Sequence, residues 1–218
     1  MSTYWYYIIC FKKGNLQETM SNNSSVKISH NSPLIRSVLQ QELLNLLQYA
    51  SSGQEIVIVC IGTDRSTGDC LGPLVGTHLA KYRSTLMHVY GSIAEPVHAL
   101  NLQQTMDTIN NSYRNPFVIG IDACLGQASS VGFIQANLGP VRPGAGVNKE
   151  LPPVGNMHIT GVVNVGGFME YFVLQNTRLH LVMSMADIIA QCLYHAIAKR
   201  YRNNLEDEQD LKLTEFKL

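Results

Sequence analysis

The chain has 218 residues with 16 basic and 16 acidic side chains, so its formal net charge is zero. This balance argues against a nucleic-acid partner, because proteins that bind nucleic acid usually carry an excess of positive charge. The length suits one domain with short extensions, and the charged fraction of 15% is low, which is compatible with a homo-oligomer.

Residues 1–31 are predicted to form a poorly defined N-terminal extension. Its apolar run, Tyr4–Phe11, is too short to cross a bilayer, which takes about 20 residues. The basic pair Lys12-Lys13 follows this run, whereas the charges of a signal peptide precede it. The five cysteines are scattered along the chain and form no close pairs, which favours a reducing compartment. We therefore expect a cytoplasmic protein with no membrane partner.

Helix and strand patterns alternate over residues 32–202, which we expect to form a single domain. Short, continuous apolar runs predict strands buried on both faces, and apolar residues at helical spacing predict amphipathic helices. In chain order the first elements are a helix over 33–49, a strand over 56–61, a helix over 73–83, a weak strand over 87–90, a helix over 97–110 and a strand over 115–123.

The second half of the chain continues this alternation with one change of direction. Residues 131–137 predict a strand that follows 115–123 too closely for a crossover helix, so we expect an antiparallel, hairpin-like connection. The remaining elements are a long loop over 139–155, a helix over 165–174, a strand over 177–183, a capping box at 184–187 that opens the final helix, and a charged tail over 203–218. The predicted fold class is α/β, a three-layer α/β/α sandwich with a mostly parallel, mixed sheet.

Two of the predicted strands lead into aspartates. Strand 56–61 runs into a loop that carries Asp64 and Asp69, and strand 115–123 ends at Asp122. Parallel neighbouring strands place such residues at one edge of the sheet, where sites of open α/β sheets form. Two carboxyl groups held close can share a proton, so that one activates water and the other protonates a leaving amine. An aspartate after a strand can equally cap the next helix, and this alternative stays open.

Other chemistries also remain open at these positions. A divalent metal could be held by Asp69, Asp122 and His158, which follows the long loop. Cys70 and Cys124 lie near acids but have no dedicated base beside them, which disfavours a cysteine nucleophile. A phosphate-binding P-loop is excluded because the acidic loop lacks the Lys-Ser/Thr pair of that motif.

Three segments together resemble a known family. Gly68–Pro73 resembles the Asp-Ala-Leu-Gly-Pro segment of germination proteases of bacterial spores, and Ile121–Leu125 resembles their second aspartate segment, Ile-Asp-Ala-Leu. Arg142–Val147, followed by Lys149-Glu-Leu151, resembles their Pro-Gly-x-Gly loop. With these motifs the chain is identified as a member of the YyaC-type sporulation family, which is related to germination protease and to hydrogenase maturation proteases.

The resemblance implies the fold of hydrogenase maturation proteases and catalytic acids at Asp69 and Asp122. In those enzymes an acid, an aspartate and a histidine contact nickel in the substrate, and Met157–Gly161 resembles the segment of that histidine. Where they have Gly-Asn after the first strand, this chain has Gly62-Thr-Asp-Arg, which leaves Asp64 as an additional acid.

We therefore predict a peptidase, a hydrolase of spore or sporulation proteins in the forespore or mother cell of a spore-forming bacterium. Its partner is a protein or peptide substrate, and the aspartate pair requires no cofactor. The predicted site residues are Asp69 and Asp122 as the catalytic pair, Asp64 and Arg65 in support, Gly144 beside the substrate cleft and His158 on its far wall. The alternatives are a non-catalytic sporulation factor that binds a protein, and a metal-dependent maturation-type endopeptidase.

Overall fold

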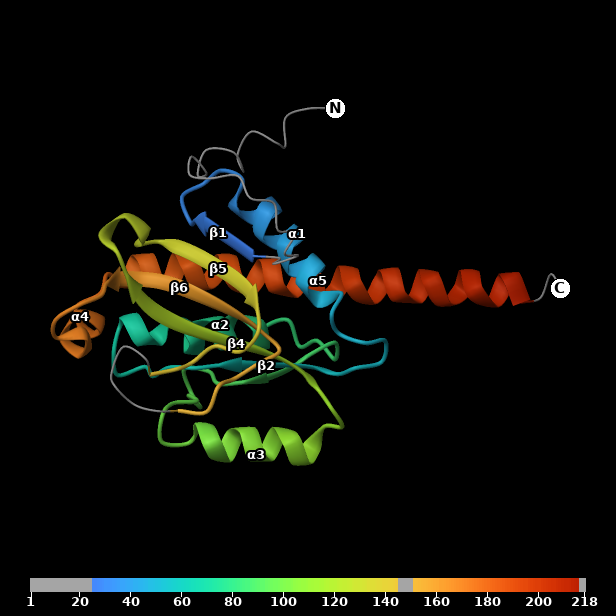
Figure 1. The fold of residues 1–218 in the computed structure, drawn as a ribbon, viewed down its shortest axis with the longest axis horizontal. Helices are drawn as coiled ribbons and strands as arrows, with labels where there is room; N and C mark the ends of the chain where they lie inside the picture. The colour runs from blue at the N-terminus through green and yellow to red at the C-terminus, as the bar shows by residue number, and fades with distance from the viewer. Residues whose placement is uncertain (1–24, 145–150, 216–218) are drawn as a thin grey trace, which may run out of the picture.

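The computed structural model describes residues 25–144 and 151–215. Residues 1–24 of the predicted N-terminal extension therefore lie outside the described residues. Within the described residues, a six-stranded sheet carries helices on both faces, which confirms the three-layer α/β sandwich (Figure 1). The strands are β1 (Ser25–Ser29), β2 (Ile56–Cys60), β3 (His88–Tyr90), β4 (Phe117–Gly126), β5 (Phe133–Leu138) and β6 (Met157–Val165). The helices are α1 (Ile35–Leu47), α2 (Leu71–Ala80), α3 (Leu102–Ser112), α4 (Glu170–Gln175) and α5 (Leu179–Glu215), with 3-10 turns η2 (Gly68–Cys70) and η3 (Ala128–Ser130).

The strand order is β1-β5-β6-β4-β2-β3, and the sheet is mixed as predicted. Strands β3, β2, β4 and β6 are parallel, whereas β5 pairs antiparallel with both β6 and β1. Strand β5 runs antiparallel to β4 as predicted, but the expected hairpin between them is wrong, because β6 lies between these strands and pairs with both. Strand β1 also belongs to the sheet, so the folded region begins before the predicted boundary at residue 32.

Alternate residues of the central strands supply two cores, one on each face of the sheet. In β2, Ile56, Ile58 and Cys60 pack into the larger core, which α1, α2 and α5 cover. Val57 and Val59 pack into the smaller core on the opposite face, beneath α3. Because both faces are covered, the whole strand is apolar, as expected for a central parallel strand.

Residues 179–215 form one long helix, α5, where the sequence predicted a strand, a helix-capping box and a separate charged tail. The strand predicted over 177–183 is wrong, because this segment runs into α5, and residues 184–187 lie inside that helix instead of capping it. Its buried side chains lie on one face at helical spacing, at Val182, Met185, Ala186, Ile189 and Leu193. The charged tail continues the same helix to Glu215 and projects beyond the body of the protein (Figure 1).

By length and composition, the segment Leu179–Leu205 of α5 is apolar enough to cross a membrane. A buried core helix passes the same test, and 56% of the apolar window is buried inside the protein. Helix α5 packs against α1 and α2, which explains why its composition is apolar.

Candidate active-site cleft

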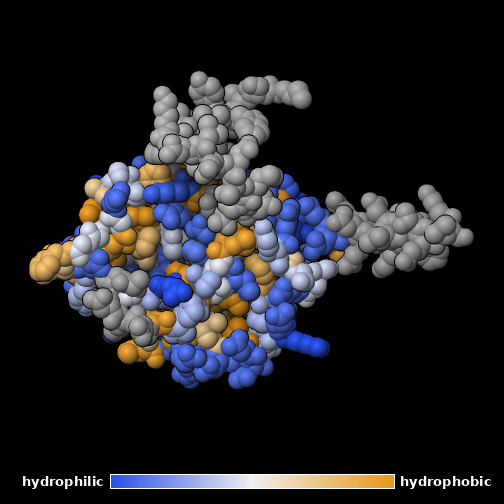
Figure 2. Space-filling model, in the orientation of Figure 1, coloured by the Kyte–Doolittle hydropathy of each residue, from blue (hydrophilic) through white to orange (hydrophobic). Residues whose placement is uncertain are grey.

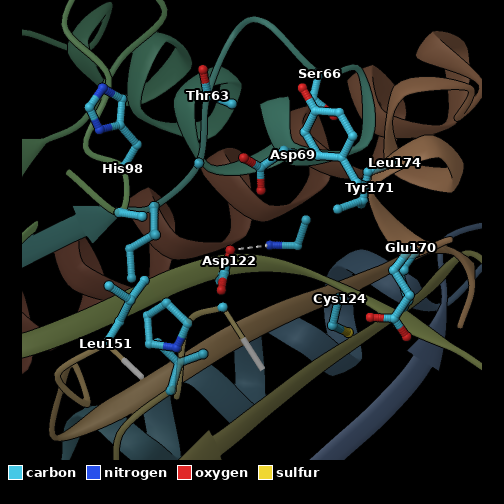
Figure 3. Close-up of a pocket in the computed structure, with 18 of the residues that line it drawn as sticks. Thr63, Ser66, Asp69, His98, Asp122, Cys124, Leu151, Glu170, Tyr171 and Leu174 are labelled. Carbon is cyan, nitrogen blue, oxygen red and sulfur yellow. Dashed lines mark hydrogen bonds between the residues drawn. The ribbon is translucent and has the colours of Figure 1, made fainter. Parts of the chain in front are cut away.

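A cleft of about 720 Å³ opens at the carboxyl ends of the parallel strands, and both predicted catalytic aspartates line it (Figure 3). The chain leaves β2 through η2 and α2 on one face of the sheet, whereas α3 precedes β4 on the other face. Strands β2 and β4 are neighbours, and the connections beside them lie on opposite faces of the sheet. This arrangement leaves a crevice at their carboxyl ends. This is the position at which open α/β sheets bind their ligands.

Asp69 reaches the cleft because the loop after β2 folds back on itself. Gly62 has a φ of 141°, and a side chain there would collide with the backbone carbonyl of Asp69. The Thr63 backbone N–H donates a hydrogen bond to the same carbonyl at 3.1 Å. This closed loop places Asp69 in the turn η2, directly beside the end of β2.

Asp122 lies in β4 itself, one residue beyond the end of β2. Cys60, the last residue of β2, pairs with Ile121, so Asp122 is the first residue of β4 without a partner on that side. Ile121 packs into the larger core, and the alternation of the strand therefore turns Asp122 to the opposite face, where it lines the cleft. Asp122 is 8% exposed, and its Oδ1 accepts a hydrogen bond from the Ala123 backbone N–H at 2.8 Å.

The two carboxyl groups are coupled electrostatically. Burial raises the pKa of Asp122 well above its ordinary value, the negative charge of Asp69 raises it further, and the Ala123 N–H partly offsets both effects. Burial also raises the pKa of Asp69, while the Thr63 backbone N–H and the charge of His98 lower it. In Figure 3 the carboxyl group of Asp69 points toward Asp122. The upward shift is the larger one at Asp122, which therefore favours its protonated form more strongly than Asp69 does.

The sequence prediction missed His98, which lines the same cleft. The chain passes β3 and forms a parallel bridge between Val97 and Ile61, which carries the next residue to the carboxyl edge of the sheet. The Leu100 backbone N–H donates to Nδ1 of His98 at 3.3 Å, which orients the ring. The sequence signal for His98 is weak, because the three-residue strand β3 does not show where the segment that follows it lies in the fold.

Of the predicted supporting residues, the structure brings Arg65 and Gly144 to the cleft. Asp64 is exposed and does not line it, and its Oδ1 accepts a hydrogen bond from the Thr63 hydroxyl at 3.4 Å. Residues 145–150 of the predicted border loop lie outside the described residues.

His158 does not form the far wall of the cleft. It lies in β6, two residues before the cleft-lining Thr160, and its Nδ1 donates to the carbonyl of Gly139 at 2.8 Å. Its Nε2 lies 3.4 Å from the side-chain amide of Asn137. Asn137 of β5 and Gly139 just after it occupy both ring nitrogens. His158 also does not line the cleft that holds Asp69 and Asp122, so the predicted metal set does not come together. Among the described residues, no group of three or more His, Cys, Asp or Glu side chains is arranged to hold a metal.

Further polar residues of the cleft were not predicted as part of an aspartate site, among them Ser66, Cys124 and Glu170. Ser66 lines the cleft, and its buried hydroxyl has no hydrogen-bond partner within residues 25–144 and 151–215. Burial raises the pKa of the Cys124 thiol to about 11, so this cysteine stays uncharged at neutral pH and is a poor nucleophile.

Comparison with known proteins agrees with the expected family. A protein of Bacillus subtilis (strain 168), described as uncharacterized protein YyaC, is 52% identical over 184 residues, which cover 84% of this chain and 88% of that protein. A [NiFe] hydrogenase maturation protease, HycI from Thermococcus kodakarensis KOD1, matches in structure with a TM-score of 0.44 and 16% identity, over 70% of this chain and 98% of that chain. The family model described as a protein of unknown function (DUF1256) matches residues 27–192. Because this match spans most of the chain, the chain belongs to the DUF1256 family.

Proposed function

We propose that the protein is a peptidase in which Asp69 and Asp122 share one proton and hydrolyse a peptide bond. The observation that carries the proposal is the cleft itself, which both aspartates line and in which burial and the charge of Asp69 raise the pKa of Asp122. Such a pair supplies a general base and a general acid at the same place.

The chemistry follows from this division of roles. The Asp69 carboxylate takes a proton from a water molecule, and the oxygen of that water attacks the carbonyl carbon of the substrate. The Asp122 carboxyl group gives its proton to the carbonyl oxygen, which yields a neutral tetrahedral intermediate. When the C–N bond breaks, the amine leaves with a proton supplied by Asp69, and a proton from the intermediate restores Asp122. The pair therefore returns to its starting state without a metal ion in any step.

The sequence resemblance to germination proteases extends the proposal to spore or sporulation proteins as substrates, cleaved in the cytoplasm of the forespore or mother cell. Arg65 is proposed to lie against the bound substrate, since it lines the cleft on the loop that also carries Asp69.

The test is a proteolysis assay on acid-soluble spore proteins with the wild type, Asp69→Asn and Asp122→Asn. Loss of either carboxyl group removes acid–base catalysis, which is worth about 10²–10⁴-fold in rate. The matched control is Asp107→Asn, which removes an exposed carboxylate from α3, outside the cleft. Equal cleavage by the wild type and Asp122→Asn would refute the aspartate mechanism.

A non-catalytic protein-binding role is the second candidate, and the exposed apolar side chains near α4 favour it. The same assay separates the two roles, because a binding protein would show no cleavage in any variant.

A further inference from the structure

A group of exposed apolar side chains borders the cleft on one side. We name it the apolar ridge, and it consists of Phe168, Met169, Tyr171 and Phe172. Phe168 is 91% exposed and the other three are more than half exposed. Figure 2 shows apolar surface at the left end of the molecule, where Figure 1 places α4. Three of the five consecutive residues 168–172 are aromatic. Each aromatic side chain buries about 150–250 Å² when it is covered, so exposing three together leaves a large apolar area in water, which is unusual unless the surface binds a partner.

The segment that carries the ridge is held firmly on the protein. The Asn164 side-chain amide donates to the carbonyl of Val173 at 3.3 Å and to the hydroxyl of Thr177 at 3.2 Å. On its inner side α4 packs over Gly68, where an added Cβ would lie 2.8 Å from Leu174. The ridge is therefore displayed by an anchored helix whose inner residues have their partners in the protein.

The ridge is continuous with the candidate cleft. Tyr171 belongs to the ridge and also lines the cleft, together with Glu170 and Leu174 of the same helix. Ser66 lines the same cleft as Tyr171 and is 7% exposed, and its hydroxyl has no hydrogen-bond partner among the described residues. The α4 side of the cleft therefore combines a buried hydrogen-bonding group with a neighbouring apolar surface. Since buried polar groups are normally paired, the Ser66 hydroxyl is a candidate hydrogen-bond donor to a bound ligand.

An extended polypeptide satisfies both features at once. Its backbone offers a free carbonyl at every residue, which can accept a hydrogen bond from Ser66. Its side chains alternate, so every second one points to the same side and can cover the ridge. A folded second copy would bring backbone groups that are already paired, and a lipid surface would bring no hydrogen-bonding group into the cleft.

We propose that Ser66 and the apolar ridge bind an extended polypeptide segment, with apolar or aromatic side chains beside the bond that lies over the aspartates. This inference rests on the proposed peptidase function, because it names the substrate class of the same cleft. Ser66 would donate a hydrogen bond to the peptide backbone whatever the sequence of the peptide, and the apolar ridge would pack against the peptide side chains.

The test measures peptide binding separately from cleavage. The full-length chain carrying Asp69→Asn and Asp122→Asn is titrated into two fluorescein-labelled 12-residue peptides, one with three alternating phenylalanines and one with serines in their place. Fluorescence anisotropy should show that the phenylalanine peptide binds about tenfold tighter. Adding Phe168→Ser and Phe172→Ser should abolish that difference, whereas adding Ser66→Ala should weaken both peptides by a similar factor of about five. The matched control is Tyr49→Ser, because Tyr49 is 56% exposed like Phe172 and lies just after α1.

The possible results separate this proposal from the peptidase proposal. If the expected binding differences are observed but the wild type cleaves no spore protein, the peptide-binding surface is supported and the peptidase function is refuted. If the wild type cleaves spore proteins and Phe168→Ser with Phe172→Ser leaves KM unchanged, the peptidase function is supported and the peptide-binding role of the apolar ridge is refuted. A dimer in sedimentation velocity that the ridge substitutions dissociate would assign the ridge to a second copy and overturn the proposal.

Discussion

Replacement of Asp122 by asparagine tests the electrostatics of the cleft through the stability of the protein. The change keeps the shape of the side chain and removes its ability to ionise. In the folded protein, burial and the charge of Asp69 raise the pKa of Asp122 well above the ordinary value of 3.8. In the unfolded chain the same group ionises near that ordinary value, because it is solvated and has no fixed neighbour.

The sign of the effect follows from proton binding. Below pH 3.8 both states of the protein hold the proton of Asp122, so pH has no effect through this group. As the pH rises, the unfolded chain releases its proton while the folded protein still keeps it. The free energy of unfolding therefore falls as the pH rises, until Asp122 ionises in the folded protein as well.

One retained proton makes the free energy of unfolding fall by about 1.4 kcal/mol per pH unit within this window. Asparagine binds no proton in either state, so the variant loses this contribution. Urea unfolding at about pH 4, 5, 6 and 7 should show the variant gaining about 1.4 kcal/mol per pH unit over the wild type, up to the folded pKa. The Asp107→Asn control should follow the wild type, because its carboxylate is exposed on α3.

Parallel curves for the wild type and Asp122→Asn between about pH 4 and 7 would refute this reasoning. They would mean that Asp122 ionises equally easily in the folded and the unfolded protein. The proposed role of Asp122 as the proton donor would then lose its physical basis, whatever the cleavage assay shows.

Three other substitutions test the packing and chemistry around the cleft. Gly68→Ala should destabilise the protein by about 1–3 kcal/mol and reduce cleavage, because its Cβ would lie 2.8–2.9 Å from Leu174 and Thr177; thermal unfolding unchanged from the wild type would contradict this. Arg200→Met should cost about 2–4 kcal/mol in urea unfolding, because Arg200 donates to the carbonyls of Leu47, Ala50 and Ser51 after α1; a loss below 1 kcal/mol, as for an exposed residue, would count against it. Cys124→Ser should retain cleavage, and iodoacetamide should alkylate Cys124 slowly at neutral pH, because burial raises its thiol pKa to about 11; rapid alkylation with loss of activity would revive a cysteine mechanism.

Local sequence patterns were sufficient for the centre of the fold. The continuous apolar runs at β2 and β4 predicted strands covered on both faces, and both are interior strands of the sheet. The aspartates that follow them were found for the same reason, since parallel strands deliver their carboxyl ends to one edge.

The same local reasoning failed where a pattern fits two structures. Residues 177–183 contain closely spaced apolar residues that are typical of a strand, yet the segment enters α5. His180 is exposed whereas Val182 is buried, which the alternation of a strand would not produce. Val182, Met185 and Ile189 are buried at the spacing of a helix. The position of α5 against α1 and α2 decided between the two alternatives.

The sequence by itself therefore determined the α/β class, the central strands and the two acids, because these depend on the order of apolar and polar residues along short segments. Only the tertiary structure decided which other residues meet the acids. It brought His98 and Ser66 to the cleft and left His158 among the hydrogen bonds of β6 and its neighbours. The physical reason is that these meetings depend on strand order and on how far each strand extends, and both are settled by packing between distant segments.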